Sequence, residues 1–126
     1  MIFDTEILIW VQRGHPKAAK LIDNTEDRFL SIYSHLELLQ SAKNKKKHRH
    51  INDFLATFGF TILPLTENIG HRALIYIEEY TLSRGIRAGD AIIAATAVEN
   101  NMALVSSNAK HSKTIKDLNL KVFKPA

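Results

Sequence analysis

The chain has 126 residues, of which 45% are hydrophobic and 24% charged, a composition that indicates one folded domain and excludes a disordered chain. Because it contains no cysteine, disulfides, thiolate catalysis and cysteine-ligated zinc are excluded, and we expect a cytoplasmic location. No apolar run is long enough to cross a membrane and no signal peptide is recognisable, so we expect no membrane partner.

The formal net charge of +4 comes mainly from one short segment. Residues 43–50 carry five of the 17 Lys and Arg residues and no acid, and the other basic residues nearly balance the 13 acids. One interpretation is a solvated helix end, where cations favour the C-terminal dipole. The other is contact with nucleic acid or an acidic protein, and the residues for it are Lys45, Lys46, Lys47 and Arg49.

Short apolar strands alternate with helical segments along the chain. We expect strands at residues 1–3, 28–32, 60–64, 102–106 and 120–123. We expect helices at residues 7–13, 16–22, 34–42, 51–58, 67–84, 90–100 and 108–115. This alternation predicts an α/β fold, a three-layer α/β/α sandwich with a short, mainly parallel central sheet, formed by a single domain over residues 1–126.

Four polar residues lie at or near the junctions where a predicted strand or turn leads into a helix: Asp4, Glu37, Asp90 and Asn108. Each has a purely structural interpretation. Asp4 and Asn108 are of the type that caps helix N-termini, Ser34 and Glu37 match a capping box, and Asp90 suits the positive end of the apolar helix that follows it. Ligands of open parallel sheets bind beyond the carboxyl ends of the strands, so these residues are also candidates for a shared site.

Carboxylates that converge at one sheet edge repel one another unless a cation lies between them. A cysteine-free, acidic ligand set favours Mg²⁺ or Mn²⁺ over zinc. Such ions support hydrolysis of phosphodiesters, and the basic segment would then contact phosphates. The junction residues therefore predict a metal-dependent enzyme that acts on a nucleic acid.

The chain resembles the PIN-domain family, and more narrowly the VapC ribonuclease toxins of type II toxin–antitoxin systems. The resemblance covers nearly the whole chain and rests on four motifs in order. These are Phe3-Asp4-Thr5-x-Ile7-Leu8-Ile9-Trp10, Ser31-Ile32-x-Ser34-x-Leu36-Glu37-Leu38-Leu39, the run Gly89-Asp90-Ala91-Ile92-Ile93-Ala94-Ala95-Thr96-Ala97, and Leu104-Val105-Ser106-Ser107-Asn108-Ala109-Lys110-His111.

The resemblance implies a PIN-like fold and an Mg²⁺- or Mn²⁺-dependent endoribonuclease that hydrolyses RNA phosphodiester bonds. It implies a cognate antitoxin protein and a homodimer as partners. Asp4, Glu37 and Asp90 match the metal-binding acids of the family, and Asn108 matches a position that often carries a fourth acid. Ser106 matches a small hydroxyl residue near the site.

The chain departs from the family pattern at several positions. Glu6 stands where Asn is usual and is a candidate accessory residue, which either joins the site beside Asp4 or points into solvent. Ser34 and His35 precede the glutamate, and Ser112 replaces a Phe. Glu6, His35 and Asn108 leave open a second hypothesis, a catalytically impaired PIN-like module that binds RNA or protein. A third hypothesis, a phosphotransfer receiver-like domain, lacks a convincing phosphoacceptor Asp.

Three further residues are candidates for the site. Arg84 and Arg87 precede Asp90, either in a solvent-facing loop or in contact with RNA phosphates. His111 follows the last motif and is a candidate accessory residue.

Overall fold

The computed structural model describes residues 1–125, and its centre is a five-stranded sheet in which every paired strand is parallel. The strand order is β3-β2-β1-β4-β5. The strands are β1 (Ile2–Phe3), β2 (Arg28–Ser31), β3 (Phe60–Leu63), β4 (Leu104–Ser106) and β5 (Leu120–Val122). The predicted α/β fold with a short parallel sheet is confirmed.

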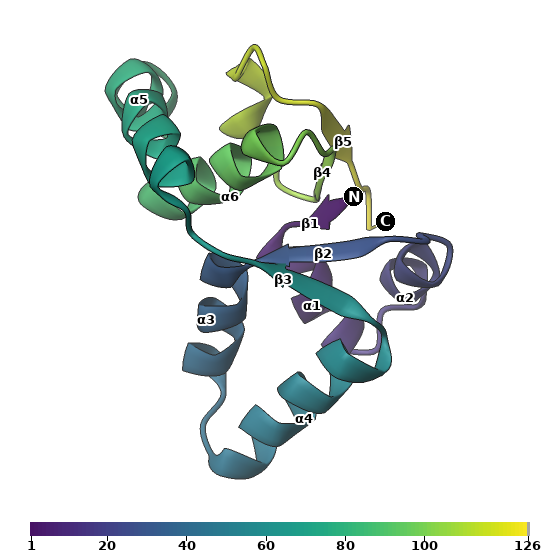
Figure 1. Cartoon of the computed structure of the whole chain (residues 1–126). Coiled ribbons are helices and arrows are strands. Elements are labelled where there is room, and N and C mark those ends of the chain that lie inside the picture. The colour runs from purple at the N-terminus through teal and green to yellow at the C-terminus, as the bar shows by residue number, and fades with distance from the viewer. Residues whose placement is uncertain (126) are drawn as a thin grey trace.

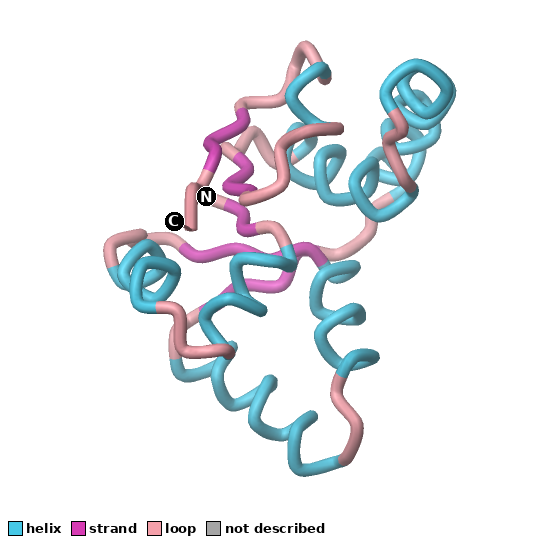
Figure 2. The backbone as a smooth tube through the Cα atoms, turned by 180° about the vertical axis from the view of Figure 1, so that it is seen from behind, coloured by secondary structure: helices cyan, strands magenta, loops and turns pink. Residues whose placement is uncertain are grey.

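Helices cover both faces of this sheet (Figures 1 and 2). They are α1 (Thr5–Gln12), α2 (Pro16–Asp23), α3 (Ile32–Ser41), α4 (Lys45–Thr57), α5 (Glu67–Arg84) and α6 (Ala88–Glu99). Helices α1–α4 pack on one face and α5 and α6 on the other, so the chain has three layers.

Successive side chains of the central strands point to opposite faces of the sheet and so enter two different hydrophobic cores. Phe3 and Val105 point into the core beneath α1–α4, whereas their neighbours Ile2 and Leu104 pack with Ile93 of α6 on the opposite face. Since both faces are covered, the central strands β1 and β4 are apolar except for Ser106 at the end of β4, as expected for a parallel sheet. None of the helices in residues 1–125 is long and apolar enough to cross a membrane.

Several predicted element boundaries are wrong. Helix α3 begins at Ile32 and is capped by Ser31, whose hydroxyl accepts from the Ser34 amide at 3.0 Å. Ser34 is therefore a buried residue inside the helix and not the first residue of a capping box with Glu37. Glu37 lies in the second helical turn.

The segment after β4 also differs from the prediction. Residues 108–115 form a loop with a single 3₁₀ turn, Ser112–Thr114, instead of a helix, so Asn108 caps nothing. Asp90 is the third residue of α6, because that helix begins at Ala88 with Arg87 as its cap.

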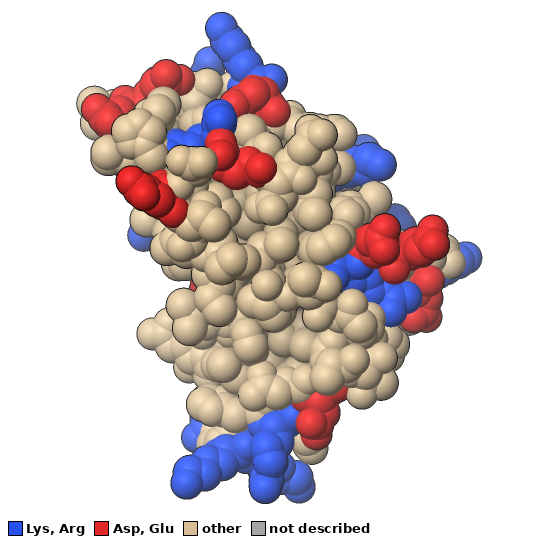
Figure 3. All heavy atoms as spheres, in the orientation of Figure 1, with Lys and Arg blue, Asp and Glu red and all other residues tan. Residues whose placement is uncertain are grey.

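Helix α4 begins within the basic segment, six residues earlier than predicted. Its first residues are Lys45, Lys46 and Lys47, with the Asn44 side chain as the cap. The basic segment therefore lies at a helix N-terminus, where positive charge is unfavourable, and the interpretation that it favours a C-terminal dipole is wrong. Figure 3 shows these Lys and Arg side chains gathered at the bottom of the molecule.

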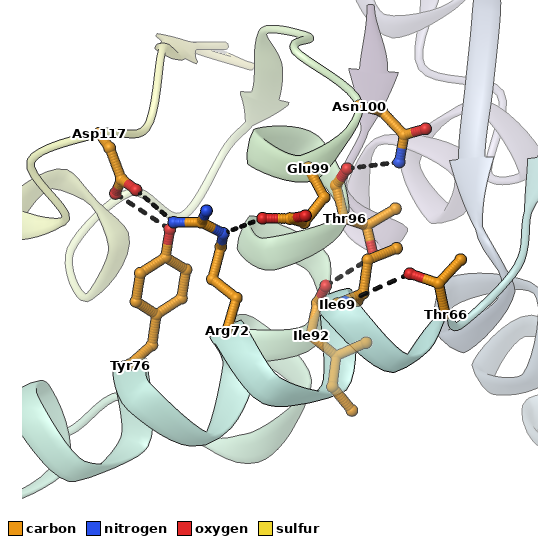
Figure 4. Close-up of polar contacts among 9 residues, drawn as sticks. All are labelled: Thr66, Ile69, Arg72, Tyr76, Ile92, Thr96, Glu99, Asn100 and Asp117. Carbon is orange, nitrogen blue, oxygen red and sulfur yellow. Dashed lines mark hydrogen bonds and ion pairs between the residues drawn. The ribbon is translucent and has the colours of Figure 1, made fainter.

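An ion-pair network ties α5 and α6 to the segment that precedes β5 (Figure 4). Arg72 of α5 forms ion pairs with Glu99 of α6 and with Asp117, the latter at 2.7 Å. The Tyr76 hydroxyl donates to the other Asp117 oxygen at 3.0 Å, and partial burial raises the pKa of Tyr76 to about 12. Arg72 thus joins three segments that lie far apart in the sequence.

We predict that Arg72→Met lowers the free energy of unfolding by about 1 kcal/mol, because Glu99 and Asp117 lose a shared cation in a half-buried setting. Urea unfolding measures the change, and 1 M NaCl should reduce it. Arg84→Met, an exposed change on the same helix, is the control. Equal stability of the two variants would contradict a stabilising network.

Candidate functional site

A cleft of about 360 Å³ opens beyond the carboxyl ends of the strands, near the point where the strand order reverses between β1 and β4. The predicted residues Asp4, Glu37, Asp90 and Asn108 all line it. Glu6, a candidate accessory residue, and Arg87, a candidate for contact with RNA, line it as well. The structure therefore gathers these six residues from four separate parts of the chain.

Asp4 is the most confined of the acids. It directly follows β1 and caps α1, so one carboxylate oxygen accepts from the Thr5 amide at 2.7 Å. The other oxygen accepts from the Ser106 hydroxyl, also at 2.7 Å. Burial raises the pKa of Asp4 and the nearby charges of Asp90 and Glu6 raise it further, whereas these two hydrogen bonds lower it and only partly offset the increase.

Ser106 connects Asp4 to Asn108. It is buried, and its oxygen accepts from the Asn108 amide at 3.1 Å while its hydroxyl donates to Asp4. Ser106 therefore lies behind the cleft as a support for Asp4. The next residue, Ser107, donates to Glu6 at 2.8 Å, so Glu6 is held at the exposed rim.

A chain of buried hydroxyls holds Glu37. The Thr5 hydroxyl lies 2.7 Å from a Glu37 oxygen and 2.8 Å from the Ser34 oxygen, and Ser34 lies 3.2 Å from Ser31. Since an ionised carboxylate only accepts and a hydroxyl has one proton, Thr5 donates to Glu37, Ser34 to Thr5 and Ser31 to Ser34. The orientation of Glu37 is thus set from β2 and α1 together.

Asp90 is fixed by its own helix. One oxygen accepts from the Arg87 amide at 3.3 Å, which leaves the other without a partner among the described residues. Gly89, beside it, lies against the ring of Tyr33, and a Cβ at this position would approach the ring within 2.7–2.9 Å. Tyr33 thereby forms one wall of the cleft, and desolvation together with Glu37 and Asp90 raises its pKa.

Five residues that line the cleft were not predicted as site residues: Thr5, Ile9, Tyr33, Gly89 and Ile93. Thr5 had a signal, since it adjoins Asp4 directly after a strand. Gly89 stands in the third motif beside Asp90 but was given no role, and Tyr33 had no signal, because the contact between the two joins α3 to α6.

Other candidates lie outside the cleft. His111 donates through Nδ1 to the Arg84 carbonyl at 2.8 Å, and Arg84 is exposed at the end of α5. The His35 ring bonds with Asn52 of α4 at 2.9 Å. Lys45, Lys46, Lys47 and Arg49 lie on α4, away from the four junction residues.

The donor chemistry of the cleft fits a hard divalent cation. Its ligands would be carboxylate and amide oxygens, and the raised pKa of Asp4 reflects mainly its burial, with a smaller contribution from the nearby charges of Asp90 and Glu6. Within residues 1–125, however, no three His, Asp or Glu side chains lie close enough to form a ready ligand group. Glu37 and Asp90 each keep a carboxylate oxygen that could serve such an ion, beside Asp4.

Residues 1–116 match the model of the PIN domain family, and the chain belongs to that family. Among solved structures, a chain from a toxin–antitoxin complex of Klebsiella pneumoniae has a TM-score of 0.80 and 26% identity, covering 99% of this chain and 97% of that one. VapBC2 from Rickettsia felis, bound to a promoter DNA fragment, has a TM-score of 0.77 and 22% identity, with 98% and 99% covered. VapBC-1 from nontypeable Haemophilus influenzae also has a TM-score of 0.77 and 22% identity, with 97% and 98% covered. No curated protein matches the chain in sequence.

We predict that Asp4→Asn raises the melting temperature of the metal-free protein at pH 7 by about 2–4 °C. The folded-state pKa of Asp4 is raised, so its charged form destabilises the fold above that pKa, and the penalty disappears as the pH falls below the ordinary value. The advantage of the variant should therefore vanish near pH 3.5.

Thermal unfolding in EDTA, followed by circular dichroism, measures this difference. Asp53→Asn is the control, because Asp53 is exposed on α4. If Asp4→Asn is less stable than the parent at pH 7, the carboxylate is not under electrostatic strain.

Proposed function

We propose that this chain is a metal-dependent endoribonuclease of the VapC type, the toxin component of a toxin–antitoxin pair. The observation that carries the proposal is the convergence of Asp4, Glu37 and Asp90 on one cleft of a PIN-family chain. The Klebsiella, Rickettsia and Haemophilus structures, described as toxin–antitoxin or VapBC complexes, support the toxin role.

In this proposal Asp4, Glu37 and Asp90 hold Mg²⁺ or Mn²⁺, and Asn108 orients water or the ion through its amide oxygen. When bound, the ion lowers the pKa of water and stabilises charge on the phosphate. The chain contributes the geometry. Ser106 and the Thr5 amide fix the Asp4 carboxylate, and the hydroxyls of Thr5, Ser34 and Ser31 fix that of Glu37.

Among the described residues that line the cleft, Arg87 is the one with a permanent positive charge. Its guanidinium suits bidentate contact with a phosphate oxygen pair, so we assign it to the scissile region of the RNA. Arg84 lies on the exposed surface nearby and would contact a neighbouring phosphate. The Tyr33 ring offers an aromatic wall for a base.

We also propose an antitoxin protein and a second copy of this chain as partners. Large apolar side chains are exposed on the surface, among them Leu36 on α3 at 57% and Leu82 on α5 at 99%. Such side chains are available for burial against a partner.

We predict that Asp90→Asn and Glu37→Gln each lower kcat for RNA cleavage at least 100-fold while the fold is retained, because each change removes a negatively charged ligand. A fluorogenic RNA assay in Mn²⁺ measures the rate, and circular dichroism checks the fold. Glu67→Gln, in the first turn of α5, is the matched control.

The outcomes separate the two hypotheses. Full activity in Asp90→Asn would overturn the metal-site assignment. RNA binding without cleavage by the parent protein would favour the alternative, a PIN-fold binding module that has lost catalysis.

A further inference from the structure

A second, larger cavity of about 590 Å³ lies between α1 and α4, and we refer to it as the α1/α4 groove. Its lining includes Arg13 of α1 and Lys47 and His50 of α4. Ile9, Ile51 and Phe54 supply apolar lining. Ile9 also lines the acidic cleft, so the two cavities adjoin along α1.

The charge of the groove is opposite to that of the cleft. Among the described residues that line the groove there are two permanent cations, Arg13 and Lys47, and no Asp or Glu. The acidic cleft, by contrast, is lined by Asp4, Glu6, Glu37 and Asp90. A polyanion cut in the cleft would be repelled there and attracted in the groove.

The cations of α4 also lack an internal counterpart. Lys45, Lys46, Lys47 and Arg49 lie in the first two turns, where the helix dipole is positive and where the structure shows no acid in the first turn. The ion pairs found within residues 1–125 involve Arg72 and none of these side chains. An external anion would therefore relieve repulsion that the fold leaves in place.

The position of this helix end is fixed. His48 donates from Nε2 to the Leu39 carbonyl at 2.7 Å, and His35 bonds with Asn52 at 2.9 Å. Both contacts hold α4 against α3, which also carries Glu37. The basic helix end is thus held at a set distance from the acidic cleft and does not depend on a loop for its placement.

From these observations we propose that the α1/α4 groove binds the flank of the RNA strand whose phosphodiester lies in the acidic cleft. Arg13 and Lys47 contact its phosphates, and Ile9 and Phe54 provide an apolar surface for a base. The proposal rests on the proposed ribonuclease function, and adds to it Arg13 and a direction for the strand along α1. It predicts that RNA reaching beyond the cleft is bound more tightly than RNA confined to it.

The test compares two double variants. The groove pair is Arg13→Gln/Lys47→Gln, and the control pair is Lys116→Gln/Lys121→Gln. The control pair removes the same charge from exposed residues of the β4–β5 connection and of β5. Each pair is placed in the Asp90→Asn background, in EDTA, and binding of a labelled single-stranded RNA is measured by anisotropy over a salt series. We expect the groove pair to weaken binding about tenfold more than the control. The slope of log Kd against log salt should also fall by about 1.4, since each phosphate contact on a single strand contributes about 0.7.

A second measurement uses the active protein. With a long RNA, Arg13→Gln/Lys47→Gln should lower kcat/KM, whereas with a dinucleotide that spans only the cleft it should equal the control. Melting temperatures verify that both pairs fold.

The outcomes are distinguishable from failure of the ribonuclease assignment. If the parent cleaves RNA but the groove pair matches the control in affinity, salt slope and kcat/KM, the groove proposal is overturned and the ribonuclease assignment stands. If the groove pair cleaves normally but escapes inhibition by a protein partner, the groove belongs to that partner and the RNA proposal is wrong.

Discussion

The partial burial of Asp4 beside other carboxylates at one edge of the sheet is the constraint on which the site depends. Asp4 is partly buried at the end of β1, and this desolvation is the main cause of its raised pKa, to which the charges of Asp90 and Glu6 add. Folding alone does not favour such an arrangement, since burial of an uncompensated charge is costly. The chain maintains it through hydrogen bonds from Ser106 and Thr5 and through helices fixed by packing.

The sheet topology explains why these acids meet. The chain proceeds from β1 outward to β3, then returns so that β4 pairs with β1 on its other side. Asp4 and Ser106 are therefore neighbours although 102 positions separate them. The apolar helix α6 brings Asp90 to the same edge from the opposite face, because its small residues pack closely on the sheet.

Much of this was predictable from local sequence. The alternation of short strands with helices identified the α/β sandwich, and Asp4, Glu37, Asp90 and Asn108 were selected because they lie at or near strand–helix junctions. What failed was local detail. Ser34 resembled a helix cap, yet Ser31 caps α3. Helix α4 begins at Lys45, because helix packing and the Asn44 cap outweigh the unfavourable interaction of the lysines with the positive end of the helix dipole.

The rest depended on contacts between distant segments, which one sequence does not reveal. The chain of hydrogen bonds that runs from Ser31 through Ser34 and Thr5 to Glu37 requires α1 to lie beside α3. The contact of Gly89 with the Tyr33 ring requires α3 to lie beside α6. Likewise, Arg13 becomes a candidate only when α1 and α4 are seen to enclose a groove.

The central proposal is that Asp4, Glu37 and Asp90 together hold a divalent cation. Calorimetric titration of the metal-free protein with Mn²⁺ tests it most directly, with Asp4→Asn, Glu37→Gln and Asp90→Asn compared against the surface variant Asp53→Asn. The account predicts that Asp53→Asn binds Mn²⁺ as the parent does and that each cleft variant loses most of the affinity. Unchanged Mn²⁺ affinity in all three cleft variants would contradict it.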